Sequence, residues 1–453
     1  MKKNCLLWIG LAVFCLTHLN MAFAQQQQVD IASSPNPLGS GARALGMGGA
    51  FIGVADDATA ASWNPGGLVQ LKKPEISLVV SGFHRSEDNT LGTDPRSETS
   101  QHVSGEDINY LSIAYPFNFL NRNMVLSLNY QHLYDFTAKW NYATSIASDA
   151  FEAESLADYK QSGHLSVLGL AYCIQVTPRL SFGLALNSWD DGLLNNQWEE
   201  NYHLSNSQTV ILPPDMPPEM AADAGSPSLT EEYRRRERYS FSGFNFNVGM
   251  LWRATDRLTI GAVFKSPFTA DLRHEKRIQD KTTDFQGEVV DISEFTYDEE
   301  LDMPMSYGLG VAYRFSDHLT LSADIYRTGW DDFTIRDSDG NTFSPVTNDD
   351  SEIDATTQVR VGGEYLIIHP SPLYVIPIRA GIFYDPLPAK GNPDHVWGLS
   401  MGSGLAIGRY VFDLAFQYRF GNGVGESAVQ YYDADFSQDV GEVMIYTSLI
   451  IHF

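Results

Sequence analysis

Val443-Met-Ile-Tyr-Thr-Ser-Leu-Ile-Ile-His-Phe453 ends the chain and decides its fold. In a strand, successive side chains point to opposite faces. One face of this segment then carries Val443, Ile445, Leu449, Ile451 and Phe453, and the other carries Met444, Tyr446, Ser448 and His452. A strand with one apolar face, one wetter face and a terminal aromatic residue is typical of the last strand of a transmembrane β-barrel.

The start of the chain indicates export. Two lysines precede an apolar run from Leu6 to Leu16, and Ala22-Phe23-Ala24 has the small-x-small pattern of a signal peptidase site. We therefore predict a cleaved signal peptide over residues 1–24. An exported protein that ends in such a strand is expected in the bacterial outer membrane.

Composition narrows the class of protein further. After the signal, no apolar run reaches the roughly 20 residues of a transmembrane helix, so membrane crossing has to rest on strands. Cys173 is the single cysteine outside the signal, which rules out an intramolecular disulfide and a cysteine metal cluster. The formal net charge of −26 argues against nucleic acid as a partner, because phosphate binding requires a basic face.

Fourteen segments in all, the C-terminal one included, alternate between apolar and polar residues, as strands that face lipid on one side do. Leu180, Phe182 and Leu184, for example, alternate with Ser181 and Gly183. The segments lie near residues 75–83, 107–116, 123–135, 163–176, 179–189, 240–254, 257–267, 304–315, 318–328, 356–368, 375–386, 396–407, 409–420 and 441–453. The pattern predicts an all-β protein, a transmembrane β-barrel of about 14 antiparallel strands over residues 74–453.

Charged residues indicate which face of these strands meets lipid. A Lys or Arg on the lipid face near the membrane midplane costs roughly 2–4 kcal/mol. The charges of the predicted strands fall on the non-apolar face, so we expect them in the lumen, several of them paired with each other or with Arg43, Asp56 and Asp57. They are Lys265, Arg314, Arg360, Arg379, Asp324, Glu364 and Asp413.

The lengths of the connections support this arrangement. Short links such as 177–178 and 316–317 alternate with long ones. Short turns on one rim and long loops on the other are the outer-membrane pattern, with the turns in the periplasm. The predicted loops are 84–106, 136–162, 190–239, 268–303 and 329–355. Pro377 lies inside a predicted strand, where it predicts a bulge or a strand that starts later.

Residues 25–73 precede the first barrel strand. A segment tethered to the periplasmic end of a barrel either hangs free or folds back into the lumen. Leu45, Phe51, Trp63 and Leu68 are apolar and favour burial. We therefore predict an N-terminal hatch that plugs the lumen.

The stretch from Gly41 to Leu68, GARALGMGGAFIGVADDATAASWNPGGL, resembles the hatch of the FadL family of long-chain fatty acid transport porins, and of the similar toluene and hydrocarbon porins. The segments Pro304–Trp330, Arg379–Asp385 and Phe412–Gly421 also resemble that family. The resemblance implies fourteen strands, a hatch in the lumen, and passage of hydrophobic molecules towards a lateral opening in the wall.

The family's Asn-Pro-Ala hatch motif corresponds to Asn64, Pro65 and Gly66 in this chain. Glycine keeps the turn but loosens it, because it has more conformational freedom in the unfolded chain. Phe51 and Leu68 of the hatch are expected to line an apolar ligand pocket. The basic run of Arg234, Arg235, Arg236 and Arg238 would contact a carboxylate head group or lipopolysaccharide phosphates, or would simply pair with neighbouring loop acids.

The predicted function is passive transport of long-chain fatty acids or similar hydrophobic compounds across the bacterial outer membrane by a monomer that contacts membrane lipid and lipopolysaccharide. Similar hatches also belong to barrels that act as secretion accessories or scaffolds, and this alternative stays open. An outer-membrane enzyme is the third alternative, although the sequence contains no evident nucleophile–base constellation.

Bound cofactors and metals are not expected. The eleven histidines show no metal-binding spacing. Asp337-Ser-Asp-Gly-Asn341 is interpreted as a loop turn, with a loose calcium site as the alternative. The glycines of Gly46-Met-Gly-Gly49 do not stand between a strand and a helix as a nucleotide-binding loop requires.

Overall fold

The computed structural model describes residues 27–28, 36, 39–91, 98–148, 151–211, 228–284, 287–344, 353–389, 391–425, 429–430 and 436–453. The predicted signal peptide lies outside the described residues.

Among the described residues, no helix has the length and apolar character that a membrane crossing requires.

In the described part of the chain, fourteen antiparallel strands close a barrel, and the last strand pairs with the first from Glu75↔His452 to Leu91↔Phe436. The strands are β2 (Glu75–Leu91), β3 (Thr99–Phe119), β4 (Arg122–Asp135), β6 (Phe151–Thr177), β7 (Leu180–Trp189), β9 (Ser228–Arg253), β10 (Leu258–Lys265), β13 (Ser306–Arg314), β14 (Leu319–Thr328), β17 (Thr356–Pro370), β18 (Leu373–Tyr384), β19 (Trp397–Ile407), β20 (Tyr410–Val424) and β22 (Phe436–His452). Each predicted segment falls on one of these strands, so the predicted barrel is confirmed.

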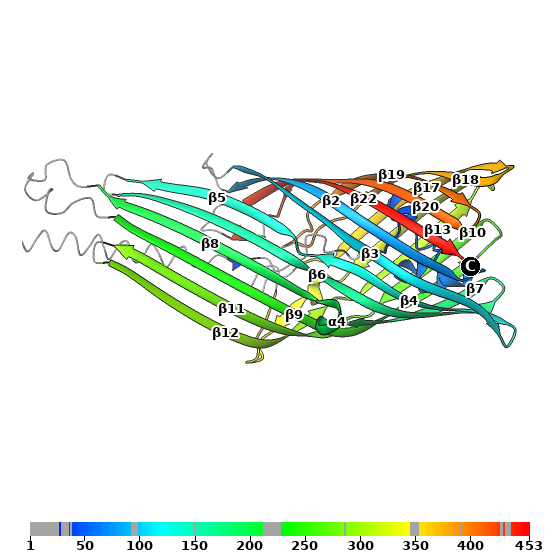
Figure 1. The fold of residues 1–453 in the computed structure, drawn as a ribbon, viewed down its shortest axis with the longest axis horizontal. Helices are drawn as coiled ribbons and strands as arrows, with labels where there is room; N and C mark the ends of the chain where they lie inside the picture. The colour runs from blue at the N-terminus through cyan, green and yellow to red at the C-terminus, as the bar shows by residue number, and fades with distance from the viewer. Residues whose placement is uncertain are drawn as a thin grey trace, which may run out of the picture.

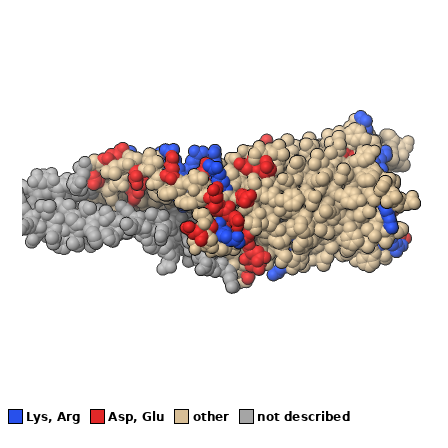
Figure 2. Space-filling model, turned by 90° about the horizontal axis from the view of Figure 1, so that it is seen from below, with Lys and Arg blue, Asp and Glu red and all other residues tan. Residues whose placement is uncertain are grey.

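The strand registers place apolar side chains outside and polar ones inside. In β14, Leu321 and Ile325 are exposed, whereas Ser322 and Asp324 are buried in the lumen. In β22, Ile445 and Leu449 face outward and Ser448 faces inward. On the face seen in Figure 2, the result is a wide and largely uncharged belt over one half of the molecule. This belt is the surface that lipid covers.

Five of the charges predicted to face the lumen are buried there: Asp324, Arg360, Glu364, Arg379 and Asp413. The prediction was wrong for Arg314, which is exposed and donates to the Asp256 carbonyl oxygen at 3.2 Å. Arg314 is the last residue of β13, beside a short turn, so its side chain reaches water at the rim.

The main correction to the prediction concerns the long outer loops. Much of their length forms β-strands. The additional strands are β5 (Ala138–Ala147), β8 (Gln197–Val210), β11 (Phe268–Asp284), β12 (Gly287–Met303), β15 (Thr334–Arg336) and β16 (Thr342–Phe343), with the short helices α4 (Asp191–Leu194) and η3 (Trp330–Asp332). In the order β5–β6–β8–β9–β11–β12, six strands form a curved sheet that rises beyond the lipid belt (Figure 1). We call this sheet the outer extension.

The strands of the outer extension have loop-like sequences because one of their faces meets water. Charged residues occupy its solvent face, where Arg236 lies 2.6 Å from Glu199 and Arg277 lies 3.2 Å from Glu294. A strand with charges on one face has a low average hydropathy, which conceals its period of two.

Pro377 neither forms a bulge nor delays its strand. The register of β17 with β18 runs unbroken from Val359↔Tyr384 to Pro370↔Leu373. Towards β19 the ladder omits Ile376 and Pro377 without a shift of register, and the Ser403 hydroxyl donates to the Pro377 carbonyl oxygen at 2.9 Å. Because proline has no N–H, it interrupts the ladder locally, but the strand continues through it.

Residues 39–74 lead into the barrel and fill part of its lumen as α2 (Ala42–Gly46), α3 (Ala60–Trp63) and η1 (Pro65–Gln70) (Figure 1). A separate pair of strands joins β1 (Gln27–Gln28) to β21 (Val429–Gln430). The exact domain boundaries, 25–73 for the hatch and 74–453 for the barrel, stay predictions.

Candidate functional site

The hatch has an apolar core of its own. Phe51 and Leu68 are completely buried, and Phe51 contacts Trp63 edge to face with ring centroids 5.9 Å apart. The Trp63 indole N–H donates to the Ser40 carbonyl oxygen at 2.7 Å, so its polar atom is satisfied. The Arg43 guanidinium lies 5.6 Å from the Phe51 ring centroid. These contacts hold the hatch as a compact body.

Asn64, Pro65 and Gly66 connect the hatch to the wall. The Asn64 amide donates to the Ile52 carbonyl oxygen within the hatch at 3.0 Å, and to the Met250 carbonyl oxygen on β9 at 2.9 Å. Its side-chain oxygen accepts the Gly66 N–H at 3.0 Å and caps η1. One side chain thus fixes a hatch turn, a helix start and a wall strand.

Wall glycines provide the space for this close approach. A Cβ at Gly183 would collide with the backbone of Pro65, and a Cβ at Gly362 or Gly381 would collide with the backbone near Met47. Gly66 fits the same pattern, because a Cβ there would lie 2.9 Å from the Gly249 carbonyl group. The glycine in place of the family's alanine therefore matches the tight contact with β9.

Ion pairs that are buried on the wall side and partly buried on the hatch side tie the hatch to the barrel. Arg43 contacts Asp56 at 2.5 Å and Glu364 on β17 at 2.9 Å. Arg379 on β18 then bridges Glu364 and Asp413, each at 2.7 Å. This part of the wall and the hatch form one charged network, so the predicted lumen pairing is confirmed here.

Backbone groups of the hatch also bind a wall carboxylate. Asp324 accepts the N–H groups of Phe51 at 2.6 Å and Ile52 at 2.8 Å. These bonds fix the loop between α2 and α3 against β14.

A second large cluster of buried apolar side chains joins residues of β4, β6, β7, β8, β9, β11 and β12, and we call it the outer cluster. It consists of Tyr134, Phe136, Leu165, Val167, Trp189, Trp198, Tyr239, Phe241, Ala270, Leu272, Leu301, Met303, Trp330, Phe333, Ile335 and Ile353, with Leu133, Phe268 and Phe343 packed against it. The rings of Phe136 and Trp198 stack at 4.6 Å, and those of Trp198 and Tyr239 at 4.7 Å. This lining suits apolar solutes and differs from the polar interior of a water-filled porin.

The wall has a break in strand pairing beside this cluster. The ladder between β3 and β4 ends at Tyr110↔Gln131; beyond it, β3 pairs with β2 and β4 pairs with β6. Irregularities mark both sides, at Val79/Val80 of β2 and at His132/Tyr134 of β4. Farther out the Thr99 hydroxyl donates to the Asn141 carbonyl oxygen at 2.8 Å. We call the gap between the Tyr110↔Gln131 pair and the Thr99–Asn141 hydrogen bond the β3–β4 break.

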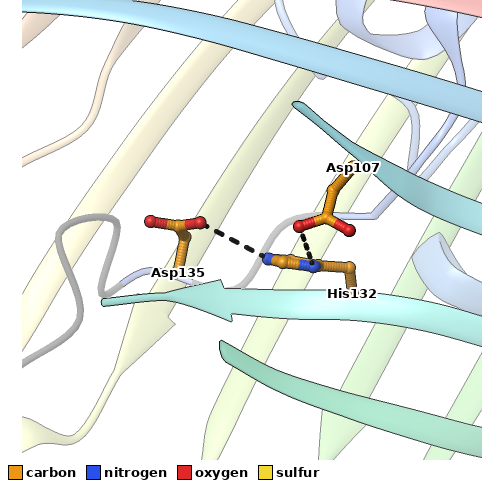
Figure 3. Close-up of side chains that lie close together, drawn as sticks. All are labelled: Asp107, His132 and Asp135. Atoms are coloured by element: carbon orange, nitrogen blue, oxygen red, sulfur yellow. Dashed lines mark ion pairs between the residues drawn. The ribbon is translucent and has the colours of Figure 1, made fainter. Parts of the chain in front are cut away.

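A cavity of about 110 Å³ lies at the β3–β4 break. Its lining includes Phe83, Met444 and Tyr446, and also Leu133, which packs against the outer cluster. Asp107, His132 and Asp135 stand at the same place, with Asp107 on β3 and the other two on β4 (Figure 3). The break, the cavity and the outer cluster are therefore contiguous.

The structure does not bring all predicted site residues together. Phe51 and Leu68 lie in the hatch core and line neither this cavity nor a smaller one of about 20 Å³ between Trp63, Lys265 and Tyr326. The arginine run lies on β9 in the outer extension, away from the hatch.

Alternation along β9 divides the arginine run between two faces. Arg235 points inward, 3.3 Å from Glu237, with its guanidinium 5.7 Å from the Tyr202 ring centroid. Arg234, Arg236 and Arg238 are exposed on the outer face. A ligand-binding role for Phe51, Leu68 or these arginines stays a prediction.

Two titratable groups of the outer extension hold each other charged. Burial alone would raise the pKa of Glu237, but the contact with His274 and the charges of Arg235 and Lys276 outweigh burial and lower that pKa to about 2. Burial likewise opposes charge on His274, yet the carboxylates of Glu237 and Glu299, 3.5 and 3.4 Å away, raise its pKa to about 9.

Comparison with protein families gives one match. The model of the family described as outer membrane protein transport protein (OMPP1/FadL/TodX) matches residues 19–419. A comparison with curated protein sequences gave no significant match.

Several solved structures share the fold. A FadL homologue of Pseudomonas aeruginosa matches with a TM-score of 0.58 and 13% identity over 92% of this chain and 100% of that one. The toluene transporter TodX of Pseudomonas putida gives 0.53 and 14% over 94% and 100%. The toluene transporter TbuX of Ralstonia pickettii gives 0.52 and 14% over 92% and 99%. At these identities the likeness concerns the fold alone.

Proposed function

Because the chain belongs to the OMPP1/FadL/TodX family of outer membrane transport proteins, which are channels and not enzymes, we propose that it carries long-chain fatty acids or similar hydrophobic compounds inward across the bacterial outer membrane. The solute would enter through the outer extension, settle in the outer cluster and leave sideways at the β3–β4 break. Among hydrophobic compounds, aromatic hydrocarbons are the alternative substrates to fatty acids.

The observation that carries this proposal is the position of Leu133. Its side chain packs on the outer cluster and also lines the cavity at the break. At the same level Ile108, on the other side of the break, is 50% exposed on the outer surface. Leu133 therefore connects the outer cluster to the break, whose cavity has a mixed lining of apolar side chains and of charged ones such as Asp107, Asp135 and Glu442.

The driving force would be the burial of apolar surface. A hydrophobic solute gains roughly 25 cal/mol for each Å² that it removes from water, so a chain of many carbons binds without a charged contact. Transfer from the outer cluster into lipid exchanges one apolar environment for another and needs no energy input. A cavity of about 110 Å³ holds only part of such a chain, so the break has to widen during passage.

The outer surface supports a contact with lipopolysaccharide as well. Basic side chains, intermixed with acidic ones, lie at one edge of the uncharged belt (Figure 2). Arg234, Arg236 and Arg238 are exposed on the outer face of β9, in the outer extension. They are suited to the phosphates of neighbouring lipopolysaccharide, alongside their own acidic partners.

Closing the break tests the route. Asp107→Cys and His132→Cys, combined in one chain, place thiols on both sides of the break, and a short bifunctional thiol reagent would join them. Cys173 is buried and should not react. In proteoliposomes we expect the cross-linked protein to lose most uptake of both a fluorescent long-chain fatty acid and toluene, if both are substrates. A cleavable reagent should restore uptake on reduction.

Each single-cysteine variant treated with the same reagent is the matched control and should transport normally. Unchanged uptake in the cross-linked double variant would refute passage through the break. Absence of uptake of any hydrophobic probe by the unmodified protein would refute transport and favour the scaffold or secretion role.

A further inference from the structure

We propose that the open edge of β12 is a docking site for a basic, extended segment of another protein, which would add a strand to the outer extension. β12 is the last long strand of that sheet (Figure 1). It pairs with β11 along its whole length, from Gly287 to Met303. On its other side, the ladder with β15 covers only residues 300–302. Residues 287–299 therefore have one edge without a strand partner among the described residues.

This edge offers both backbone groups and apolar side chains to a partner. In an antiparallel ladder, every second residue points its N–H and C=O away from the strand it pairs with. The apolar side chains along the edge face water: Val289 is 69% exposed, and Val290, Ile292 and Phe295 are 44–50% exposed. By alternation, Val290 and Ile292 lie on one face of the sheet, and Val289 and Phe295 lie on the other. An added strand would gain backbone hydrogen bonds and apolar contacts on both faces.

β12 lacks the features by which proteins usually protect such an edge. Exposed edge strands are commonly short, bulged or interrupted by proline, or they carry lysine. β12 is 17 residues long, its register with β11 has no shift, and its sequence GEVVDISEFTYDEELDM contains neither proline nor lysine. The other edge strand, β5, has 10 residues and carries Lys139, and its Asn141 carbonyl oxygen accepts a hydrogen bond from Thr99 of β3. The β12 edge is therefore the more open of the two.

The charge of β12 favours a basic partner. Seven of its residues are acidic and none is lysine or arginine. Cationic side chains of β11 lie 2.9 Å from the Glu288 carboxylate and 3.2 Å from that of Glu294. Asp291 and Asp298 belong to no ion pair within the described part of the chain. A strand with lysine or arginine on this edge would place positive charge beside these carboxylates.

Asp291 marks a position where an added cation would be favourable. It lies directly opposite Asp280 in the ladder between β11 and β12, and like charges in that arrangement destabilise a sheet. Burial and the charge of Asp291 together raise the pKa of Asp280. A basic side chain from a third strand would relieve this repulsion.

The short contact with β15 is a precedent within the molecule. β15 pairs with the same edge of β12 and brings Arg336 directly opposite Glu300. The Arg336 guanidinium lies 2.6 Å from the Glu300 carboxylate and 3.3 Å from that of Asp302. A basic strand along residues 287–299 would repeat this arrangement. A second copy of β12 would instead bring acids against acids, so the edge is unsuited to pairing with itself.

Binding of a synthetic peptide to the purified full-length protein in detergent tests the proposal. The probe is a short fluorescent peptide of arginine, valine and threonine with both ends blocked, and empty micelles serve as the blank. Fluorescence anisotropy should give a micromolar Kd. A peptide with glutamate in place of arginine should bind at least tenfold more weakly. N-methylation of alternate amides should cause a similar loss, because it removes the hydrogen bonds of the added strand. In hydrogen exchange, the basic peptide should slow the amides of β12 and leave those of β5 unchanged.

Ile292→Lys should weaken binding of the basic peptide at least tenfold, because a lysine on the edge repels a basic strand. Leu156→Lys is the matched control. Leu156 is also exposed, but it lies on β6, which pairs with strands on both sides, so this variant should bind like the parent protein. Asp298→Asn changes a single exposed charge and should weaken binding severalfold. All three variants should keep a heat-stable barrel on gels.

Equal affinity for the basic, acidic and methylated peptides would overturn the proposal, as would parental affinity in both Ile292→Lys and Asp298→Asn. Self-association of the protein that Ile292→Lys abolishes would also overturn it, because the edge would then belong to a second copy of the chain.

Discussion

At the scale of single residues, the hatch is held by a few side chains whose partners are distant in sequence. Arg43 is the central one, because its guanidinium contacts hatch and wall carboxylates together. Sequence patterning placed the wall charges in the lumen because a strand has only two faces. It failed for Arg314, since alternation does not reveal how close a residue lies to the rim.

Replacement of Arg43 tests this network. Arg43→Met removes the ion pair between the hatch and Glu364, which then keeps only Arg379 on β18 as its partner. We expect the hatch amides from Ala42 to Trp63 to exchange hydrogen much faster, while exchange in the barrel strands stays unchanged. Mass spectrometry of peptic fragments measures this difference. Arg314→Met, at the exposed rim, is the control, and equal exchange in both variants would contradict a tethering role.

At the scale of elements, the strands of the outer extension were predicted as loops from the sequence. The barrel strands are recognisable in the sequence because lipid requires one continuous apolar face. The strands of the outer extension face water on one side, so Glu199, Arg236 and Arg277 lower their average hydropathy. The β3–β4 break was equally hidden, because pairing partners and bulges leave no pattern in one strand's sequence.

The Glu237–His274 contact makes the outer extension sensitive to pH. His274 has its pKa raised from 6.5 to about 9, so its stabilising contribution is complete below pH 6.5 and lost as the pH rises through 9. Glu237 has its pKa lowered from 4.5 to about 2, so its contribution is complete above pH 4.5 and lost as the pH falls towards 2.

We therefore expect the strands β9 and β11 to be best protected between about pH 4.5 and 6.5. Hydrogen exchange, corrected for the intrinsic pH dependence of the amides, measures that protection. His274→Gln should remove the loss of protection between pH 7 and 9. A variant that still loses protection over this range would show that another group titrates.

At the scale of the whole molecule, closure of the barrel does not depend on the hatch. Each wall strand pairs with wall strands on both sides, and β2 and β22 complete the ring by themselves. The resemblance in the hatch and the alternation in the wall were together sufficient to predict this architecture. They could not predict a lateral route, which depends on how two neighbouring strands diverge.

Deletion of residues 42–70 tests that independence. We expect the shortened chain to assemble into a heat-resistant barrel, because the wall pairing remains. The exposed lumen carries polar groups such as Asn129, Gln131 and Gln417, so water and ions should then pass. Planar bilayer recordings should show a large rise in ion conductance relative to the full chain. A deleted barrel that assembles and still blocks ions would mean that the outer cluster, and not the hatch, seals the channel.

The glycine contacts between hatch and wall also constrain the order of folding. Met47 lies against Gly362 and Gly381 late in the chain, whereas Pro65 lies against Gly183 near its middle. A body fitted so closely to strands around the ring has no clearance to slide in from the periplasmic end after the ring is complete. The seam between β2 and β22 therefore has to close around a hatch that is already in place. In the full chain the N-terminal residues, which are synthesised first, would then be enclosed before the last strand pairs with the first, although that pairing itself needs only wall strands.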